Sequence, residues 1–154
     1  MGRRVNRHPL LKALFFLYAG FMLYLLFFRT WRYDPALPYW DQVLANREME
    51  PFKTINNFIA VIRGNPDHPD YFLCFTNMFG NTLLFIPAGM LLPKLYGKLR
   101  PFLKFFIKAA LLIALIETIQ LFALLGIFDV DDIILNVLGM SFGYFLYFLF
   151  MRKK

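Results

Sequence analysis

The sequence predicts an all-α membrane protein in which four transmembrane helices form a bundle. Hydrophobic residues make up 59% of the 154 residues and aromatic residues 19%, which is more apolar side chain than a soluble domain of this length can bury. The charged residues gather in clusters, and the apolar runs between the clusters are each long enough to cross ~30 Å of hydrocarbon. The basic clusters also fall in alternate connections, as the topology of a multi-pass protein requires.

The four apolar runs are the predicted spans. They cover about residues 10–31, 71–92, 105–128 and 133–151. At ~1.5 Å per residue each run reaches across the hydrocarbon. No small-residue cleavage site follows the first run, so we interpret it as a retained signal anchor. No repeat or linker interrupts the chain, and residues 1–154 are expected to form a single membrane domain.

The basic residues predict the orientation of the spans. They gather before the first span, between the second and third, and after the fourth, in residues 3–12, 94–104 and 152–154. Cytoplasmic connections carry an excess of Lys and Arg, so we expect both termini in the cytoplasm. This pattern also accounts for the net charge of +7. Because no basic binding fold can be recognised between the spans, we expect no nucleic-acid partner.

The first outer connection, residues 32–70, is expected to contain a short amphipathic helix that lies at the membrane surface. Its apolar residues recur at helical spacing: Ile55, Phe58, Ile59 and Ile62. Thr54 is placed to cap its start and Gly64 to end it. We expect this helix to close as a lid over the polar residues described next.

Glu117 is the most informative residue, because an ionisable side chain inside a transmembrane helix costs on the order of 3 kcal/mol unless a partner holds it. Counted from the predicted outer ends, Glu117 and Asn81 each lie about ten residues deep, or ~15 Å at ~1.5 Å per residue. Both are therefore expected near the midplane of the membrane.

Three pairs of polar residues, each spaced three or four positions apart, share a helix face: Asn77 with Asn81, Glu117 with Gln120, and Asp132 with Asn136. We predict that these six residues form a ligand-binding cleft that opens to the outer leaflet and binds a polar headgroup or a proton. Asp129 and Asp131 are expected to flank its mouth. Membrane lipids are the expected partners.

Simpler explanations stay open for several of these residues. The amides can join helices through interhelical hydrogen bonds worth roughly 0.6 to 2 kcal/mol each, which explains Asn136 easily and Glu117 poorly. Asp129 and Asp131 can instead cap the helix that follows, because a carboxylate there accepts from free backbone amides. Gly139 and Gly143 form a small-xxx-small face that we assign to helix packing.

The sequence carries no recognisable catalytic or metal-binding pattern. Thr82, Thr118 and Ser141 have no histidine at a reachable depth, so we assign no catalytic residue. The acidic turn alone supplies too few oxygen ligands for a hard cation, so we predict no metal and no cofactor.

Two blocks of the sequence resemble the VanZ-like family. Residues 77–89 are similar to its N-x-x-x-N-x-x-L-F-x-P-x-G signature, and Glu117-x-x-Gln120 followed by residues 131–139 is similar to its E-x-x-Q and D-D-x-x-x-N-x-x-G pattern. Residues 51–55 are a weaker match to a P-F-x-T-I segment that many members carry. With this segment included, the resemblance covers about residues 46–145. Many members place an arginine shortly before the acidic turn, where this chain has Gly126, Ile127 and Phe128.

The resemblance implies a role in the bacterial cell envelope, because the family is named after a protein that raises resistance to teicoplanin. We therefore expect a protein of the bacterial plasma membrane that contributes to teicoplanin-type glycopeptide resistance or handles envelope lipids, binding a lipid, a lipid-linked cell-wall precursor or a lipoglycopeptide. Two alternatives stay open. The first is a small proton-coupled lipid or solute transporter, which would need a homodimer because four spans are few. The second is a membrane enzyme acting on lipid headgroups, with Glu117 and Asp132 as acid and base.

Overall fold

The computed structural model describes residues 9–28, 32–64 and 71–152, and these are helical almost throughout. The four long helices are α1 (Pro9–Phe28), α4 (Tyr71–Leu95), α5 (Phe102–Phe122) and α6 (Val130–Leu146), and the π-helical segment η2 (Tyr147–Met151) continues α6. Each of the four contains a stretch that is long and apolar enough to cross a membrane. The predicted fold class, an all-α membrane protein with four spans, is confirmed.

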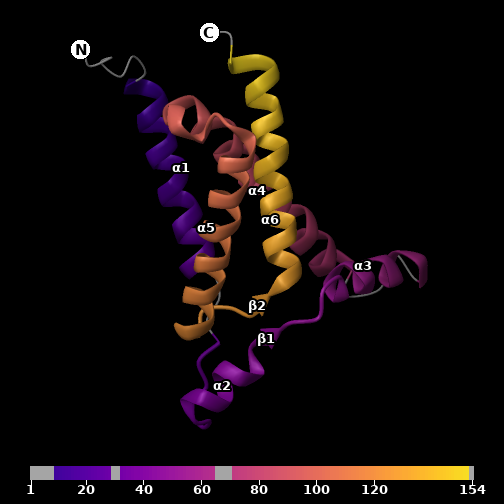
Figure 1. Ribbon diagram of the computed structural model, residues 1–154. Coiled ribbons are helices and arrows are strands. Elements are labelled where there is room, and N and C mark those ends of the chain that lie inside the picture. Colours follow the sequence, from indigo (N-terminus) through magenta and orange to yellow (C-terminus); the bar gives the residue numbers. More distant parts are fainter. Residues whose placement is uncertain (1–8, 29–31, 65–70, 153–154) are drawn as a thin grey trace.

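The four long helices lie side by side, with the start of α1 and the end of η2 at the same end of the bundle (Figure 1). The 3₁₀ turn η1 (Gly97–Leu99) joins α4 to α5 at that end as well. The remaining elements gather at the opposite end or beside it. The bundle therefore has one end with short connections and one end with more elaborate structure.

The connection between α1 and α4 contains α2 (Tyr39–Ala45), β1 (Arg47–Glu48) and α3 (Lys53–Gly64). Strand β1 pairs in parallel with β2 (Phe128–Asp129), which lies between α5 and α6. This small sheet ties the connection to the start of α6. Helix α3 confirms the predicted amphipathic helix, whereas α2 and the two strands were not predicted.

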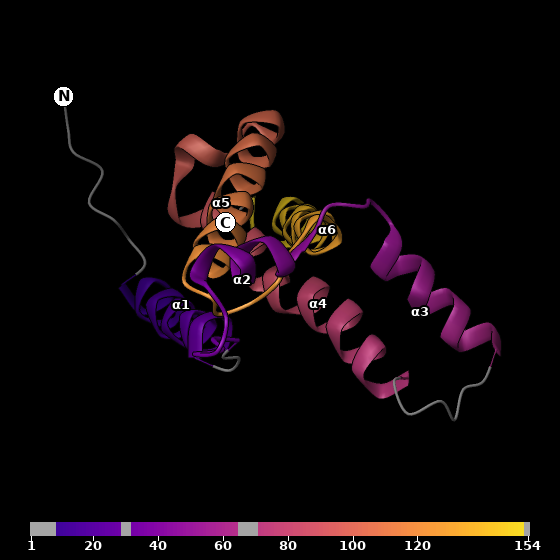
Figure 2. The same cartoon turned by 90° about the horizontal axis from the view of Figure 1, so that it is seen from below.

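Helix α3 lies beside the bundle and does not cover its end (Figure 2). Its one buried residue, Phe58, packs against Phe75 and Phe79 of α4, with ring centroids 6.4 and 6.1 Å apart. Helix α2 instead packs on the end of α5, where Val43 is buried against Leu121. The expected lid is thus not placed over the bundle, because Phe58 holds α3 against the side of α4. Ile59 and Ile62 of the same face stay exposed.

Helices α4 and α6 form the closest pair in the bundle, and glycines permit this approach. A Cβ atom built on Gly139 would lie 2.0 Å from the carbonyl oxygen of Thr82, and one on Gly143 would lie 2.0 Å from that of Ile86. Gly89 meets the backbone of α6 in the same way. The predicted packing role of Gly139 and Gly143 is confirmed.

An apolar core fills the space between α4, α5 and α6. Its buried members are Met22, Phe85, Ala88, Phe105, Ala109, Ile113, Val137 and Met140. Helix α1 contributes only Met22 to this set, and the Tyr18 hydroxyl donates a hydrogen bond of 2.6 Å to the Leu84 carbonyl of α4. Most of α1 is therefore left facing outward from the bundle, as suits a helix in contact with lipid.

Candidate functional site

A polar cavity of about 440 Å³ lies where the α1–α4 connection meets α4, α5 and α6. Six of the eight residues predicted from the sequence line it: Asn81, Glu117, Gln120, Asp129, Asp132 and Asn136. They come from three different spans and from the turn between α5 and α6. The structure thus gathers these side chains in one place, and their role in binding a ligand stays a prediction.

Asn81 and Asp132 join the two closest helices at this cavity. The Asn81 Nδ2 atom of α4 donates a hydrogen bond of 2.6 Å to Oδ1 of Asp132, which lies in the first turn of α6. The glycine contacts two turns further along α6 hold the two helices close enough for this bond. The amide therefore fixes the orientation of the carboxylate.

Glu117 is buried, with 4% of its surface exposed, and its carboxyl group forms a hydrogen bond with the backbone of Asp129. In the part of the chain that the structure describes, no Lys or Arg forms an ion pair with it. Helix α5 ends at Phe122, so Glu117 lies five residues from the helix end. The predicted count of about ten residues from the outer end of this span is therefore too large for Glu117, and its depth in the membrane stays a prediction.

The early end of α5 has a clear local cause. The Leu125 N–H donates to the Gln120 carbonyl at 2.9 Å and the Leu124 N–H to the Leu121 carbonyl at 3.1 Å, while Leu124 has φ 53°. This is a Schellman motif, in which glycine is the usual left-handed residue. Leu124 occupies that position here and is buried against Val43. Hydropathy alone could not show this end, because a leucine gives no stop signal.

Gln120 and Asn136 differ in how their polar atoms are satisfied. Gln120 Nε2 donates a hydrogen bond of 2.7 Å to the carbonyl of Leu26, near the end of α1. Asn136 has only 2% of its surface exposed, and its Oδ1 has no hydrogen-bond partner among the described residues. A buried acceptor without a donor is unfavourable by roughly 1–3 kcal/mol. A hydrogen-bond donor from outside the described residues would therefore stabilise this oxygen.

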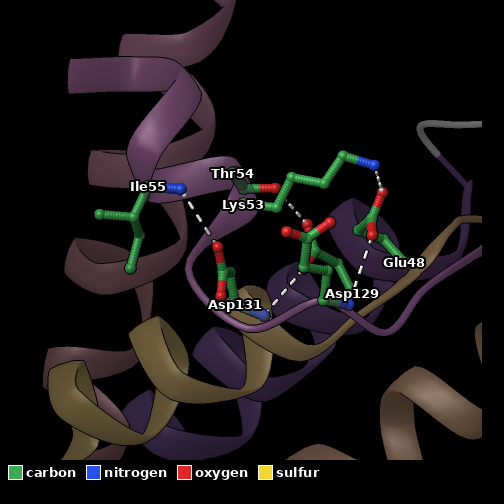
Figure 3. A network of polar contacts seen from close by, with 7 residues as sticks. Glu48, Lys53, Thr54, Ile55, Asp129 and Asp131 are labelled. Carbon is green, nitrogen blue, oxygen red and sulfur yellow. Dashed lines mark hydrogen bonds and ion pairs between the residues drawn. The ribbon is translucent and has the colours of Figure 1, made fainter. Parts of the chain in front are cut away.

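Asp129 and Asp131 form a network with the start of α3 (Figure 3). Oδ1 of Asp131 accepts from the Phe52 N–H at 2.5 Å and Oδ2 from the Ile55 N–H at 3.1 Å. Asp129 accepts from the Asp131 N–H at 2.8 Å, which caps α6, and from the Thr54 hydroxyl at 2.7 Å. Asp131, which is fully buried and does not line the cavity, thus caps α3 in place of Thr54.

The network joins residues 51–55 to the acidic turn, two segments that both belong to the sequence resemblance described above. Phe52 has φ 65°, a left-handed conformation that is strained for a bulky residue. Its N–H is held by Asp131, and Thr54 is held by Asp129. Residues 51–55 and the acidic turn are therefore bonded to each other in the structure. These bonds anchor the α1–α4 connection beside the cavity.

Charged residues that sequence reasoning did not select also line the cavity. Arg32, Arg47 and Glu48 all come from the α1–α4 connection. Glu48 forms an ion pair with Lys53, whose hydrogen bond lowers the pKa of Glu48, and Glu48 in turn raises the pKa of Lys53. This is the only ion pair among the described residues, so Arg32 and Arg47 have no carboxylate within ion-pair distance there. No periodicity marks these positions, because Arg32 lies before α2 and Arg47 and Glu48 form the two-residue strand β1.

Two further predictions concern Asn77 and metal binding. Asn77 lies on α4, but its side chain is outside the part of the chain that the structure describes. Within the described residues, no three His, Cys, Asp or Glu side chains are grouped so that they could hold a metal ion. Four carboxylates line the cavity. Those of Glu48 and Asp129 bond to Lys53 and Thr54. This leaves two carboxylates and an amide oxygen at the helical wall and two guanidinium groups from the connection.

Comparison with known proteins gives one finding. A family model described as VanZ/LLP1 matches residues 15–151, which include all eight predicted site residues. No curated protein and no solved structure matches the chain.

Proposed function

The chain belongs to the VanZ/LLP1 family, and from this premise we propose that it is a multi-pass protein of the bacterial plasma membrane that binds an amphiphilic envelope molecule. The cavity beside Glu117 and Asp132 is the binding site, and it faces outward. Through this binding the protein contributes to teicoplanin-type glycopeptide resistance, or to the handling of envelope lipids or cell-wall precursors.

The distribution of basic residues supports an outward-facing cavity. Lys94, Lys98, Arg100 and Lys104 lie in or beside the α4–α5 connection, at the same end of the bundle as the start of α1 and the end of η2 (Figure 1). By the positive-inside rule this end faces the cytoplasm. The α1–α4 connection and the acidic turn lie at the opposite end, so the cavity that they line opens to the outside.

The unsatisfied oxygen of Asn136 is the observation that carries the proposal. If the polar residues only joined helices, their buried atoms would be expected to bond to other groups of the protein. Asn81 and Gln120 follow this expectation, since they donate to Asp132 and to the Leu26 carbonyl. Asn136 does not, although it is buried at the cavity wall. A bound ligand that supplies a donor explains this arrangement.

We expect Glu117→Gln to abolish protection against teicoplanin in a susceptible Gram-positive host, while the wild type protects. Glutamine keeps the size and the acceptor oxygen that bonds to the Asp129 backbone, so the variant removes the charge and leaves the fold intact. The measurement is the minimal inhibitory concentration at membrane levels matched by immunoblot. Glu50→Gln is the matched control, because Glu50 is exposed and does not line the cavity; it should protect like the wild type.

Full protection by Glu117→Gln at equal abundance would refute the role of the cavity. If the wild type itself gives no protection, the resistance role is wrong for this member. The proposal would then reduce to the binding of envelope lipids. Native mass spectrometry with defined lipids tests that binding directly.

A further inference from the structure

We infer that the ligand of the cavity carries a primary ammonium group beside a phosphate, and that the ammonium is bound at the helical wall formed by Glu117, Asp132 and Asn136. This inference rests on the proposed binding function and adds the chemistry of the ligand. The argument follows from which hydrogen-bonding groups of the cavity are already used within the protein.

At the helical wall of the cavity, the amide nitrogens of Asn81 and Gln120 each make a hydrogen bond within the protein, whereas two acceptor oxygens have no described donor. The amide donors of Asn81 and Gln120 bond to Asp132 and to the Leu26 carbonyl. Asp132 accepts only the bond from Asn81 among the described hydrogen bonds, which leaves its second carboxylate oxygen. Asn136 Oδ1 has no donor among the described residues. A ligand that binds here must therefore bring donors.

The charges at the wall narrow the choice of donor. Glu117 is buried and Asp132 is half-buried, and neither forms an ion pair within the described chain. A carboxylate removed from water needs a compensating cation or a proton. A primary ammonium is a cation with three N–H donors and no acceptor, which matches one group each from Glu117, Asp132 and Asn136. A hydroxyl group brings no charge, and a quaternary ammonium brings no donor, so neither satisfies this wall.

The other side of the cavity suits an anion. Arg32 and Arg47 line it together with Glu48, whose carboxylate is paired with Lys53. No carboxylate of the described residues pairs with either guanidinium. Arg47 Nε makes a long contact of 3.4 Å with the Leu44 carbonyl, which leaves its terminal nitrogens for other partners. A guanidinium group binds phosphate through two parallel hydrogen bonds. The cavity therefore has a cation-binding wall and an anion-binding rim.

The size and the apolar lining of the cavity are compatible with a phospholipid headgroup. A volume of about 440 Å³ falls within the usual range of ligand pockets. Leu25 and Leu26 of α1 also line it, so the bound molecule would meet an apolar surface at the edge of the membrane. The shared chemistry is that of phosphoethanolamine, either as the headgroup of phosphatidylethanolamine or as the free soluble molecule.

The test is native mass spectrometry of the purified full chain with equal amounts of phosphatidylethanolamine and phosphatidylcholine that carry the same acyl chains. The two lipids share the phosphate and differ in whether the ammonium has N–H donors. We expect phosphatidylethanolamine to bind about tenfold more tightly than phosphatidylcholine. One hydrogen bond to a charged group changes the dissociation constant by about that factor. Asp132→Asn and Asn136→Leu should reduce this preference toward equal binding.

Variants at the rim separate the two halves of the site. Arg47→Gln should weaken binding of both lipids and leave the preference between them unchanged, because both carry the phosphate. Asp41→Asn and Arg63→Gln are the matched controls: both side chains are exposed and neither lines the cavity. Both controls should bind like the wild type. Soluble phosphoethanolamine is added as a competitor, and displacement of the lipid shows that the headgroup alone is recognised.

Each outcome decides a different statement. Equal binding of the two lipids by the wild type, or stronger binding of phosphatidylcholine than of phosphatidylethanolamine, overturns the ammonium inference and leaves the proposed binding function standing. Failure to bind either lipid or soluble phosphoethanolamine also overturns the inference, and the glycopeptide test then decides the proposed function. Binding of soluble phosphoethanolamine without the lipid supports the chemistry and assigns its source to solution.

Discussion

Replacing Gly139 by alanine is expected to lower the melting temperature of the purified protein by roughly 10 °C, because overpacking at this contact should cost about 3 kcal/mol. The added methyl group would lie 2.0 Å from the carbonyl oxygen of Thr82. The contacted atom belongs to the backbone, which cannot change rotamer as a side chain can. Helices α4 and α6 must therefore move apart. The same separation would pull Asn81 away from Asp132, and lipid binding should fall together with stability.

The measurement is thermal unfolding in detergent followed by circular dichroism. Gly20→Ala is the matched control, since a Cβ at Gly20 meets nothing within 4 Å. Alanine there should leave the melting temperature unchanged or raise it slightly, because alanine has the higher helix propensity. If Gly139→Ala melts within a degree or two of the Gly20→Ala control, the close α4–α6 contact is wrong.

Replacing Asp131 by alanine is expected to release α3 from the bundle. The fully buried carboxylate accepts from the N–H groups of Phe52 and Ile55, and two such bonds to an ionised group are worth about 3 kcal/mol or more. Opening of α3 should become ~100-fold more frequent. The measurement is hydrogen exchange of the amides in Lys53–Gly64, which should speed up by that factor while α4 and α6 remain protected.

Asp34→Ala is the matched control for this variant. Asp34 also accepts a bond from a backbone N–H, that of Ala36 at 2.9 Å, but it is exposed and lies outside α3. Exchange in α3 should therefore be unchanged. Unchanged exchange in the Asp131→Ala protein itself would mean that the acidic turn does not anchor α3.

The sequence was sufficient to predict the helices that obey a simple periodic or hydropathic pattern. The spans follow from the length of their apolar runs, and α3 follows from an apolar stripe at helical spacing. Gly139 and Gly143 could be assigned to packing because a spacing of four residues places both on one face of a helix. These features depend on local sequence, so no knowledge of distant contacts was needed.

Features that depend on contacts between distant residues could not be predicted. Helix α2 is held by the Tyr39 hydroxyl, which donates to the Phe122 carbonyl at 2.7 Å, and by Val43 against Leu121. The parallel pairing of β1 with β2 joins residues about 80 positions apart. The end of α5 at a left-handed Leu124 likewise depends on burial against α2. None of these features leaves a local signal.

For the candidate site, the cost of polar groups in an apolar span was the useful signal. It selected Glu117, Asn81 and Asn136, and the structure places all three at one cavity. This signal could not show that Asp132 lines the cavity while Asp131 caps α3. Neighbouring residues on a helix point about 100° apart, and only the fold decides which partner each one meets. The same signal also gave no information about Arg32 and Arg47, since charged residues in a connection are solvated by default.

The central claim is that a polar cavity between the spans opens to the outside of the cell, and cysteine accessibility tests it most directly. Cys74 is the chain's one cysteine, so Cys74→Ser provides the background for single replacements Arg47→Cys at the rim, Asn81→Cys at the helical wall and Lys98→Cys at the other end. Asn81 is half-buried and lines the cavity. Ala109→Cys, in the buried core, is the negative control. Intact cells are treated with a charged, membrane-impermeant thiol reagent, and labelling is compared with that after permeabilisation.

We predict that Arg47→Cys and Asn81→Cys are labelled in intact cells, that Lys98→Cys is labelled only after permeabilisation, and that Ala109→Cys is labelled in neither case. Labelling of Lys98→Cys in intact cells together with protection of Arg47→Cys would contradict the orientation. Labelling of Arg47→Cys without any labelling of Asn81→Cys would contradict the cavity itself.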